Sequence, residues 1–257
     1  MPDLDHPIDV SEEAGVRYLH FGSDWVQGAM RIARPYSLEL AYTREMMAGL
    51  LLREREPWPE TLLLIGLGAG SLTKFAWRHL PRCKITVVEI NPRVAAMARQ
   101  CFKLPEAGPH LDYRFEDGAR FVARAREAGE RYDWILVDGF DPQARAGALD
   151  RQPFYRDCAA LLGPRGLLGV NFLGRSRGFG ASVARLEEAF PGRTLVFPSC
   201  DSGNAIAFAA VGERVDGSQE ELKERAQTLK KDTGLNLLPT LARLEQAGHF
   251  QGRRLVL

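Results

Sequence analysis

The sequence predicts a Rossmann-like, doubly wound α/β domain built on a mostly parallel sheet. From about residue 58 to 213, short apolar segments alternate with longer segments of helical periodicity. The apolar segments are hydrophobic at nearly every position, which is typical of strands buried on both faces of a parallel sheet. The 257 residues carry a net charge of +1, so no global field would attract nucleic acid or an acidic membrane.

Residues 1–57 predict a small N-terminal hairpin and helix. The stretch 16–32 is expected to form two strands around a turn near Gly22. Ser37 is in position to cap a helix over 38–54, and a Pro-Trp-Pro break follows that helix.

The central segment predicts strands and helices in alternation. The expected parallel strands are 61–66, 84–90, 111–117, 132–139 and 166–174. The expected helices are about 72–80, 92–102, 119–128, 153–163 and 181–190, with Pro92 in the first turn of the second and Gly163 closing the fourth. Two last strands, 193–198 and 204–212, predict one antiparallel pairing at an edge of the sheet.

The tail, residues 214–257, predicts two further helices, over 218–231 and 237–250. No apolar run reaches the roughly 18 residues of a membrane span, and the acidic N-terminus does not resemble a signal peptide. The four cysteines lie far apart and form no Cys-x-x-Cys pair. We therefore expect a cytoplasmic protein with reduced thiols and no metal site.

Glycines and carboxylates follow four consecutive strands of the predicted sheet. In chain order they are Gly66, Gly68 and Gly70, then Glu89, then Asp117 and Gly118, and finally Asp138 and Asp141. Ligands of open α/β sheets bind at the carboxyl ends of the strands, so these residues predict one ligand site. Its glycines would let the backbone approach an adenosine closely, Glu89 would hold the ribose hydroxyls, and Asp117 would accept from the adenine amino group.

The spacing of the glycines narrows the choice of ligand. NAD-binding loops follow G-x-G-x-x-G, whereas this loop follows G-x-G-x-G, and no Gly-Lys-Ser/Thr of a phosphate-binding loop is present. No basic residue adjoins the loop before Lys74, which suits a sulfonium better than a pyrophosphate. The sequence thus indicates the fold of S-adenosylmethionine-dependent transferases, with S-adenosylmethionine or a close relative as co-substrate.

Over roughly residues 15–175 the chain resembles the spermidine synthase (polyamine aminopropyltransferase) family. The resemblance rests on the glycine loop and on the motifs VVEIN, EDGARFV, YDWILVDGFDP and FYRDCAALLGPRGLL. It implies transfer of an aminopropyl group from decarboxylated S-adenosylmethionine to a polyamine. It further implies that Asp138 is the catalytic carboxylate, that Asp141 contacts the diamine, and that Gln27 touches the nucleoside. The segment YTREMMAGLLL is similar to the family's tyrosine helix, which makes Tyr42 a second catalytic candidate.

The chain departs from the family pattern at three places. Ala69 stands where the family has an Asp that contacts the donor's amino group and disfavours ordinary S-adenosylmethionine by charge repulsion. Gly139 and Phe140 replace a Ser-Ser pair, and Phe140 either narrows the acceptor pocket or plugs the core. Acidic residues for a distal ammonium are sparse, with Glu45 and Asp24 as the candidates.

Three hypotheses follow from the residues and the resemblance. The first is a spermidine synthase-like transferase, the second a methyltransferase acting on a small amine, and the third a non-catalytic nucleoside-binding scaffold. Ala69 favours the second, whereas Asp138, Asp141 and the tyrosine helix favour the first. The expected partner is a small-molecule amine, without nucleic acid or membrane, and a homodimer is left open.

Overall fold

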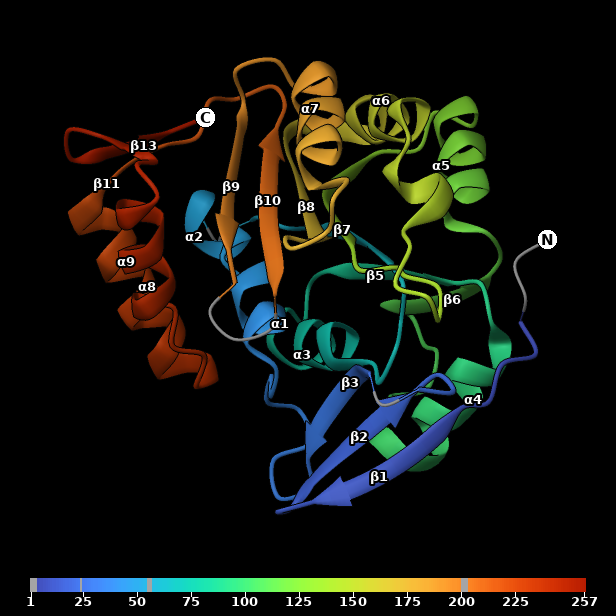
Figure 1. Ribbon diagram of the computed structural model, residues 1–257. Coiled ribbons are helices and arrows are strands. Elements are labelled where there is room, and N and C mark those ends of the chain that lie inside the picture. The colour runs from blue at the N-terminus through green and yellow to red at the C-terminus, as the bar shows by residue number, and fades with distance from the viewer. Residues whose placement is uncertain (1–3, 24, 55–56, 200–202) are drawn as a thin grey trace.

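A seven-stranded sheet forms the centre of the molecule (Figure 1). The computed structural model describes residues 4–23, 25–54, 57–199 and 203–257. Within these ranges the strand order is β6-β5-β4-β7-β8-β10-β9. The strands are β4 (Thr61–Ile65), β5 (Lys84–Glu89), β6 (Leu111–Phe115), β7 (Tyr132–Val137), β8 (Leu162–Leu173), β9 (Thr194–Pro198) and β10 (Asn204–Ala210). The predicted strands are confirmed, and β10 runs antiparallel to both β8 and β9.

Helices cover both faces of this sheet, as expected for a doubly wound fold. One face packs against α3 (Ser71–His79) and α4 (Pro92–Phe102), and the other against α5 (Gly118–Glu127), α6 (Gln152–Leu161) and α7 (Phe179–Ala189). A single turn of 3-10 helix, Gly147–Asp150, precedes α6. The order of the strands reverses between β4 and β7, which makes the carboxyl ends of these two strands the switch point where ligands bind in such sheets.

Three local predictions are wrong. The expected helix over 38–54 is two short helices, α1 (Ala41–Met46) and α2 (Gly49–Leu52). Leu40 rather than Ser37 precedes α1, and no side chain caps it. The chain turns between the two helices and brings Gly49 against Trp134, where a Cβ would lie 2.7 Å from the ring. Gly163 does not close α6, because the chain enters β8 directly at Leu162.

A small antiparallel sheet precedes the central domain and lies below the main sheet in Figure 1. It contains β1 (Asp9–Glu13), β2 (Val16–His20) and β3 (Val26–Arg31), so the predicted hairpin is confirmed and β1 is an addition. The residues of β1 are mostly exposed and polar, and for that reason the strand has no apolar signal in the sequence.

The tail contains the two predicted helices, α8 (Gln219–Thr233) and α9 (Leu238–Gln246). It also contains a small sheet that was not predicted, formed by β11 (Asp216–Ser218), β12 (Phe250–Gln251) and β13 (Arg254–Val256). Leu50, Leu62 and Leu229, from the three expected segments, belong to one hydrophobic core. The division at residues 57 and 213 stays a prediction.

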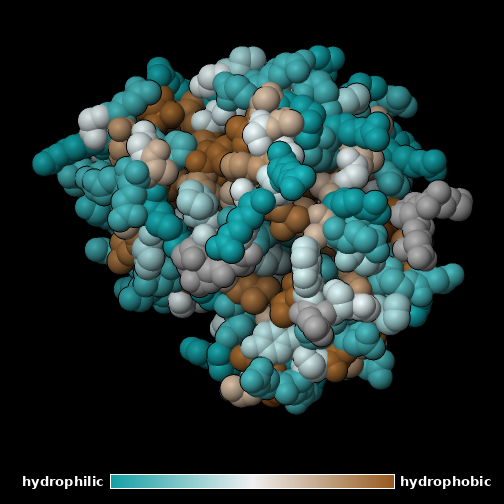
Figure 2. Space-filling model, viewed as in Figure 1, coloured by the Kyte–Doolittle hydropathy of each residue, from teal (hydrophilic) through white to brown (hydrophobic). Residues whose placement is uncertain are grey.

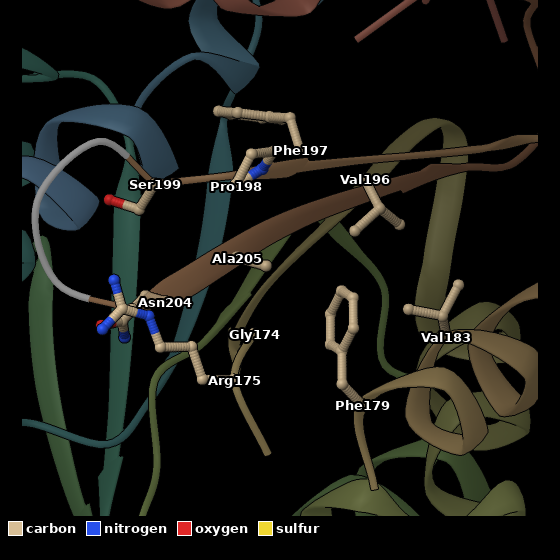
Figure 3. Close-up of a pocket in the computed structure, with 11 residues that line it drawn as sticks. Gly174, Arg175, Phe179, Val183, Val196, Phe197, Pro198, Ser199, Asn204 and Ala205 are labelled. Atoms are coloured by element: carbon tan, nitrogen blue, oxygen red, sulfur yellow. The ribbon is translucent and has the colours of Figure 1, made fainter. Parts of the chain in front are cut away.

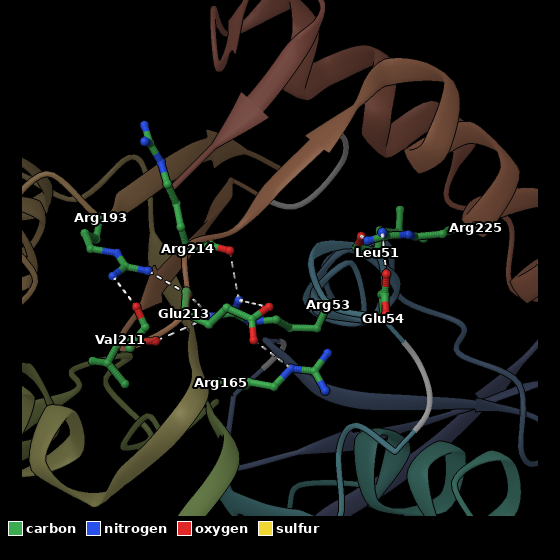
Figure 4. A network of polar contacts seen from close by, with 10 residues as sticks. Leu51, Arg53, Glu54, Arg165, Arg193, Val211, Glu213, Arg214 and Arg225 are labelled. Atoms are coloured by element: carbon green, nitrogen blue, oxygen red, sulfur yellow. Dashed lines mark hydrogen bonds and ion pairs between the residues drawn. The ribbon is translucent and has the colours of Figure 1, made fainter.

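Arginine side chains tie the tail to α2 (Figure 4). Arg53, which is 2% exposed, donates to the carbonyl oxygens of Val211, Glu213 and Arg214 beyond β10. Burial lowers the pKa of Arg53 to about 10, so the guanidinium stays charged at neutral pH. Arg225 of α8 donates to the carbonyl of Leu51 at 3.0 Å. These contacts join α2 to the segment after β10 and to α8. None of the helices in the described parts of the chain is both long and apolar enough to span a bilayer.

Candidate functional site

A cavity of about 1040 Å³ lies between the small N-terminal sheet and the carboxyl ends of the main strands. Residues from β3, α1 and the ends of β4, β5, β7 and β8 line it. In the view of Figure 2 most of the surface is hydrophilic, and hydrophobic side chains gather toward the middle of the face. The volume is large enough for a nucleoside and a second small molecule.

The glycine loop after β4 packs against two neighbouring backbones. Gly66 has φ +94°, and a Cβ there would lie 2.1 Å from the carbonyl oxygen of Asp138. A Cβ on Gly68 would lie 2.9 Å from the carbonyl oxygen of Gln27. Both glycines and Gln27 line the cavity, whereas Gly70 lies outside it, in the left-handed conformation that starts α3. Glycine is therefore required at Gly66 by the close approach of the backbone at Asp138, one residue beyond β7.

Glu89, at the end of β5, anchors the glycine loop through its carboxylate. Its carboxylate accepts hydrogen bonds from the backbone N–H of Leu67, at 3.0 Å, and of Asn91, at 2.8 Å. Burial raises the pKa of Glu89, and these backbone hydrogen bonds lower it in part. The side chain is 8% exposed and lines the cavity. It therefore both anchors the loop and presents a charged acceptor to a ligand.

Asp117 and Gly118 line the cavity at the start of α5. Asp117 is the N-cap of this helix, and its Oδ1 accepts from the backbone N–H of Arg120 at 2.9 Å. A Cβ on Gly118 would lie 2.5 Å from Ile65, so the helix starts directly against β4. The cap uses one carboxylate oxygen of Asp117 and leaves the other available to a ligand.

Asp138 is half-buried in the wall of the cavity, one residue beyond β7. Its Oδ1 accepts from Asn171 at 2.8 Å, and the hydroxyl of Tyr42 donates to the same carboxylate. Burial raises the pKa of Asp138, and the hydrogen bonds from Asn171 and Tyr42 oppose that rise. Burial and the charge of Asp138 raise the pKa of Tyr42 well above its usual value, so the tyrosine stays a donor. The structure thus brings the two predicted catalytic residues together.

Asp141 also lines the cavity, but its carboxylate is engaged within its own loop. Oδ1 accepts from the backbone N–H groups of Gln143 and Arg145, both at 2.9 Å. Oδ2 accepts from Nε of Arg145 at 2.7 Å. An amine that binds Asp141 would therefore compete with the Arg145 guanidinium.

The other residues predicted to bind the amine substrate do not all line the cavity. Phe140 is half-buried and lines the cavity, which favours the pocket over the core plug. Glu45 is not among the lining residues; it is 2% exposed and forms an ion pair with Arg243 of α9. The other candidate for a distal ammonium, Asp24, lies outside the described residues.

Ala69 faces the N-terminal sheet rather than the ligand cavity. It is 2% exposed, and a Cβ on Gly28 of β3 would lie 2.6 Å from the Ala69 methyl group. Ala69 is therefore not among the residues that line the cavity, and β3 occupies the space beside this part of the loop. Ser71 donates to the carbonyl of Ala29 at 3.2 Å and holds the two segments together.

Two asparagines that were not predicted as site residues are linked to Asp138, Asn171 directly and Asn204 through Asn171. Asn171 lies on β8 and Asn204 begins β10, and Asn204 donates to Asn171 at 2.7 Å. Asn171 is a polar residue inside an apolar strand, which is the signal that marks it in the sequence. Asn204 also lines a second cavity of about 480 Å³, beside Arg175 and Ser199 (Figure 3). The far end of that cavity is apolar, with Phe179 and Val183.

Within the described ranges, no group of three His, Cys, Asp or Glu side chains could hold a metal ion. Independence from metal stays a prediction.

Comparisons with known proteins relate this site to one family. The spermine/spermidine synthase domain model matches residues 39–170. A polyamine aminopropyltransferase of Neisseria meningitidis is 35% identical over 96% of this chain and 92% of its own length. The structure of human methyltransferase-like protein 13 in complex with SAH matches with a TM-score of 0.69 at 29% identity, over 76% of this chain and 93% of that one. A spermidine synthase in complex with the transition-state analogue AdoDATO matches in fold, with a TM-score of 0.64 at 20% identity, over 95% of this chain and 89% of that one.

Proposed function

Because the chain belongs to the spermine/spermidine synthase family, we propose that it transfers the aminopropyl group of decarboxylated S-adenosylmethionine to a polyamine. The observation that carries the proposal is the position of Asp138. This carboxylate, with Tyr42 and Asn171 bound to it, lines the same cavity as Glu89 and Asp117. A nucleoside held by Glu89 and Asp117 would present its sulfonium side chain within the same cavity as Asp138.

The proposed reaction is a direct displacement at carbon. The lone pair of the acceptor amine attacks the methylene carbon that is bonded to the sulfonium. The C–S bond breaks, and its electrons move to sulfur, which leaves methylthioadenosine. Asp138 accepts the proton that the amine loses as the new C–N bond forms.

The amine must be neutral before it attacks. The nearby sulfonium lowers the pKa of the amine by like-charge repulsion, and burial raises the pKa of Asp138 toward that of a usable base. Alignment of amine, carbon and sulfur in the cavity contributes most of the rate acceleration. Tyr42, whose raised pKa keeps it protonated, holds the carboxylate by donating a hydrogen bond.

The variant Asp138→Asn tests the role of Asp138. It keeps the size of the side chain but cannot accept the proton, so we expect kcat to fall roughly 10²-fold or more. Methylthioadenosine should bind as in the wild type, by isothermal titration. An active Asp138→Asn enzyme would reassign this residue to a structural role.

The variant Glu89→Gln tests the nucleoside site. The amide cannot accept from both backbone N–H groups, so the glycine loop and the ribose both lose a charged acceptor. We expect the Kd of methylthioadenosine to rise at least about 10-fold, the equivalent of one charge-assisted hydrogen bond. Glu116→Gln, on the exposed pair with Arg124, is the matched control and should bind methylthioadenosine normally. Unchanged affinity in Glu89→Gln would contradict the adenosine assignment.

Methyl transfer from S-adenosylmethionine to a small amine is the second candidate. The likeness to the human methyltransferase-like protein in complex with SAH favours it. The two reactions leave different thioethers. Mass spectrometry of the products with each donor separates them: methylthioadenosine indicates aminopropyl transfer, and S-adenosylhomocysteine indicates methyl transfer. Formation of S-adenosylhomocysteine alone would overturn the first proposal.

A further inference from the structure

Three polar side chains that line the cavity are joined by hydrogen bonds, and two of them belong to strands of the central sheet. Asn204 donates through Nδ2 to Oδ1 of Asn171 at 2.7 Å, and Asn171 donates through Nδ2 to Oδ1 of Asp138 at 2.8 Å. Asn171 is 4% exposed, in the middle of an otherwise apolar part of β8. A buried amide in such a position destabilises the folded protein unless its donor and acceptor groups are all hydrogen-bonded.

The chemistry of Asp138 fixes the direction of both amides. An ionised carboxylate only accepts hydrogen bonds, so Asn171 must turn its NH₂ group toward Asp138. The carbonyl oxygen of Asn171 then faces Asn204, which must supply a donor. Reversal of either amide would place two acceptors or two donors against each other.

Two rigid strands carry this line of side chains. β8 and β10 pair antiparallel, with Asn171 opposite Ile206 and Asn204 opposite Leu173. By contrast, the segment after Asp138 is an irregular loop through Asp141 and Arg145. The sheet can therefore hold the Asp138 side chain more firmly than its own loop does.

We propose that Asn171 and Asn204 are positioning residues, which fix the Asp138 carboxylate so that its remaining lone pairs face the acceptor amine. The inference rests on the proposed function, in which Asp138 accepts the proton of the amine. Asn171 acts directly on Asp138, and Asn204 acts only through Asn171. Orientation of the base matters because proton transfer requires hydrogen-bond geometry with the reacting nitrogen.

Kinetics of a double-mutant cycle test this order of action. Asn204→Ala should lower kcat about 5–10-fold, the equivalent of one neutral hydrogen bond. Asn171→Leu should lower it about 10–100-fold, because it removes a hydrogen bond to a charged group. In the Asn171→Leu background, Asn204→Ala should have no further effect. The Kd of methylthioadenosine should stay unchanged in all three variants.

An isosteric variant tests the direction of the hydrogen bonds. Asn204→Asp keeps the shape of the side chain but presents only acceptors to Asn171, which then turns its own carbonyl oxygen toward Asp138. It should lower kcat more than Asn204→Ala does. Ile206→Val, which changes packing opposite Asn171 without touching the amides, is the matched control and should leave kcat within about 2-fold, since it costs only a small packing term.

The ionisation of Asp138 gives a readout that does not need turnover. Tyr42 is the titratable group bonded to Asp138, and it stays protonated. Loss of the Asn171 hydrogen bond should raise the pKa of Asp138, measured by NMR of ¹³C-carboxyl aspartate with Asp138→Asn assigning the signal. The pKa of Asp138 should rise in both single variants, Asn204→Ala and Asn171→Leu. In the double variant the rise should be no larger than in Asn171→Leu alone.

Two results would overturn the inference. One is a wild-type kcat and Asp138 pKa in a correctly folded Asn204→Ala protein. The other is an effect of Asn204→Ala that persists undiminished in the Asn171→Leu background. Failure of the wild type to transfer any group would overturn the proposed function instead, and the NMR titration would still decide whether the amides act on Asp138.

Discussion

Single residues in this molecule combine a structural task with a chemical one. Glu89 anchors the glycine loop through two backbone N–H groups while it lines the cavity. Asp117 caps α5, and Asp138 is held by Asn171 and Tyr42. Each carboxylate is thus oriented before any ligand arrives, and fixed acceptors of this kind make binding sites selective.

Lys74 has no role in the proposed chemistry and gives a prediction about stability. It is 1% exposed, and its ammonium donates to the carbonyl of Phe102 at the end of α4. Burial lowers the pKa of Lys74 from 10.5 to about 7. Between these two pH values the unfolded chain binds a proton that the folded protein lacks, so lowering the pH through this window favours unfolding.

Replacement of Lys74 by Met should therefore stabilise the protein in a pH-dependent way. The gain in free energy of unfolding should be about 2–4 kcal/mol at pH 7 and below, after subtraction of the lost hydrogen bond. It should shrink steadily as the pH rises from 7 toward 10.5. Urea unfolding of both proteins across this range measures the difference, with the exposed Lys84→Met as control. A difference that is constant with pH would contradict the depressed pKa.

At the scale of elements, the shape of the cavity depends on the packing of β3 against the glycine loop. The backbone of β3 lies so close to the loop that Gly28 and Gly68 have no room for a Cβ. β3 also occupies the space beside Ala69 and contributes Gln27 to the cavity. The N-terminal sheet therefore forms one wall of the ligand site rather than a separate appendage.

The variant Gly28→Ala tests this packing. The added methyl group would lie 2.6 Å from the Ala69 methyl and 2.8 Å from its backbone nitrogen, so β3 must move away from the loop. We expect a loss of about 1–3 kcal/mol of stability, typical of overpacking, and weaker binding of methylthioadenosine. Gly180→Ala in α7, where nothing lies within 4 Å of the new methyl, is the control. Normal binding by Gly28→Ala would show that β3 does not shape the nucleoside site.

At the scale of the whole molecule, the C-terminal tail supports the helix that carries Tyr42. α9 contributes Arg243 to an ion pair with the buried Glu45 of α1, three residues beyond Tyr42. Arg53 joins α2 to the segment after β10, and Arg225 of α8 donates to the carbonyl of Leu51 in α2. Residues from opposite ends of the chain thus fix one wall of the cavity.

Loss of Arg243 should therefore destabilise the protein strongly. Arg243→Leu leaves the carboxylate of Glu45 buried without the cation of α9, which should cost about 3–5 kcal/mol in urea unfolding. Adding Glu45→Gln to this variant should recover much of the loss. Arg254→Leu removes an exposed ion pair with Asp216 in the same tail and should cost less than about 1 kcal/mol. An equal loss of stability in Arg243→Leu and Arg254→Leu would show that the burial of Glu45 is unimportant.

The sequence by itself determined the fold class and the strand ends at which the large cavity lies. Continuous apolar strands, the glycine loop and the spacing to Glu89 and Asp117 are local signals, and the strands and helices of the central domain follow them closely. Pro92 at the start of α4 is one such signal. The antiparallel course of β10 followed from the shortness of its connection to β9.

Only the tertiary structure decided which side chains meet. Asn204 reaches Asn171 because β10 pairs with β8, Arg243 reaches Glu45 across 198 positions, and β3 fills the space beside Ala69. Such contacts depend on long-range packing, which leaves no periodicity or motif in a single sequence. The same reason explains why the sequence did not separate α1 from α2: Gly49, at the start of α2, packs against Trp134, a residue of a distant strand.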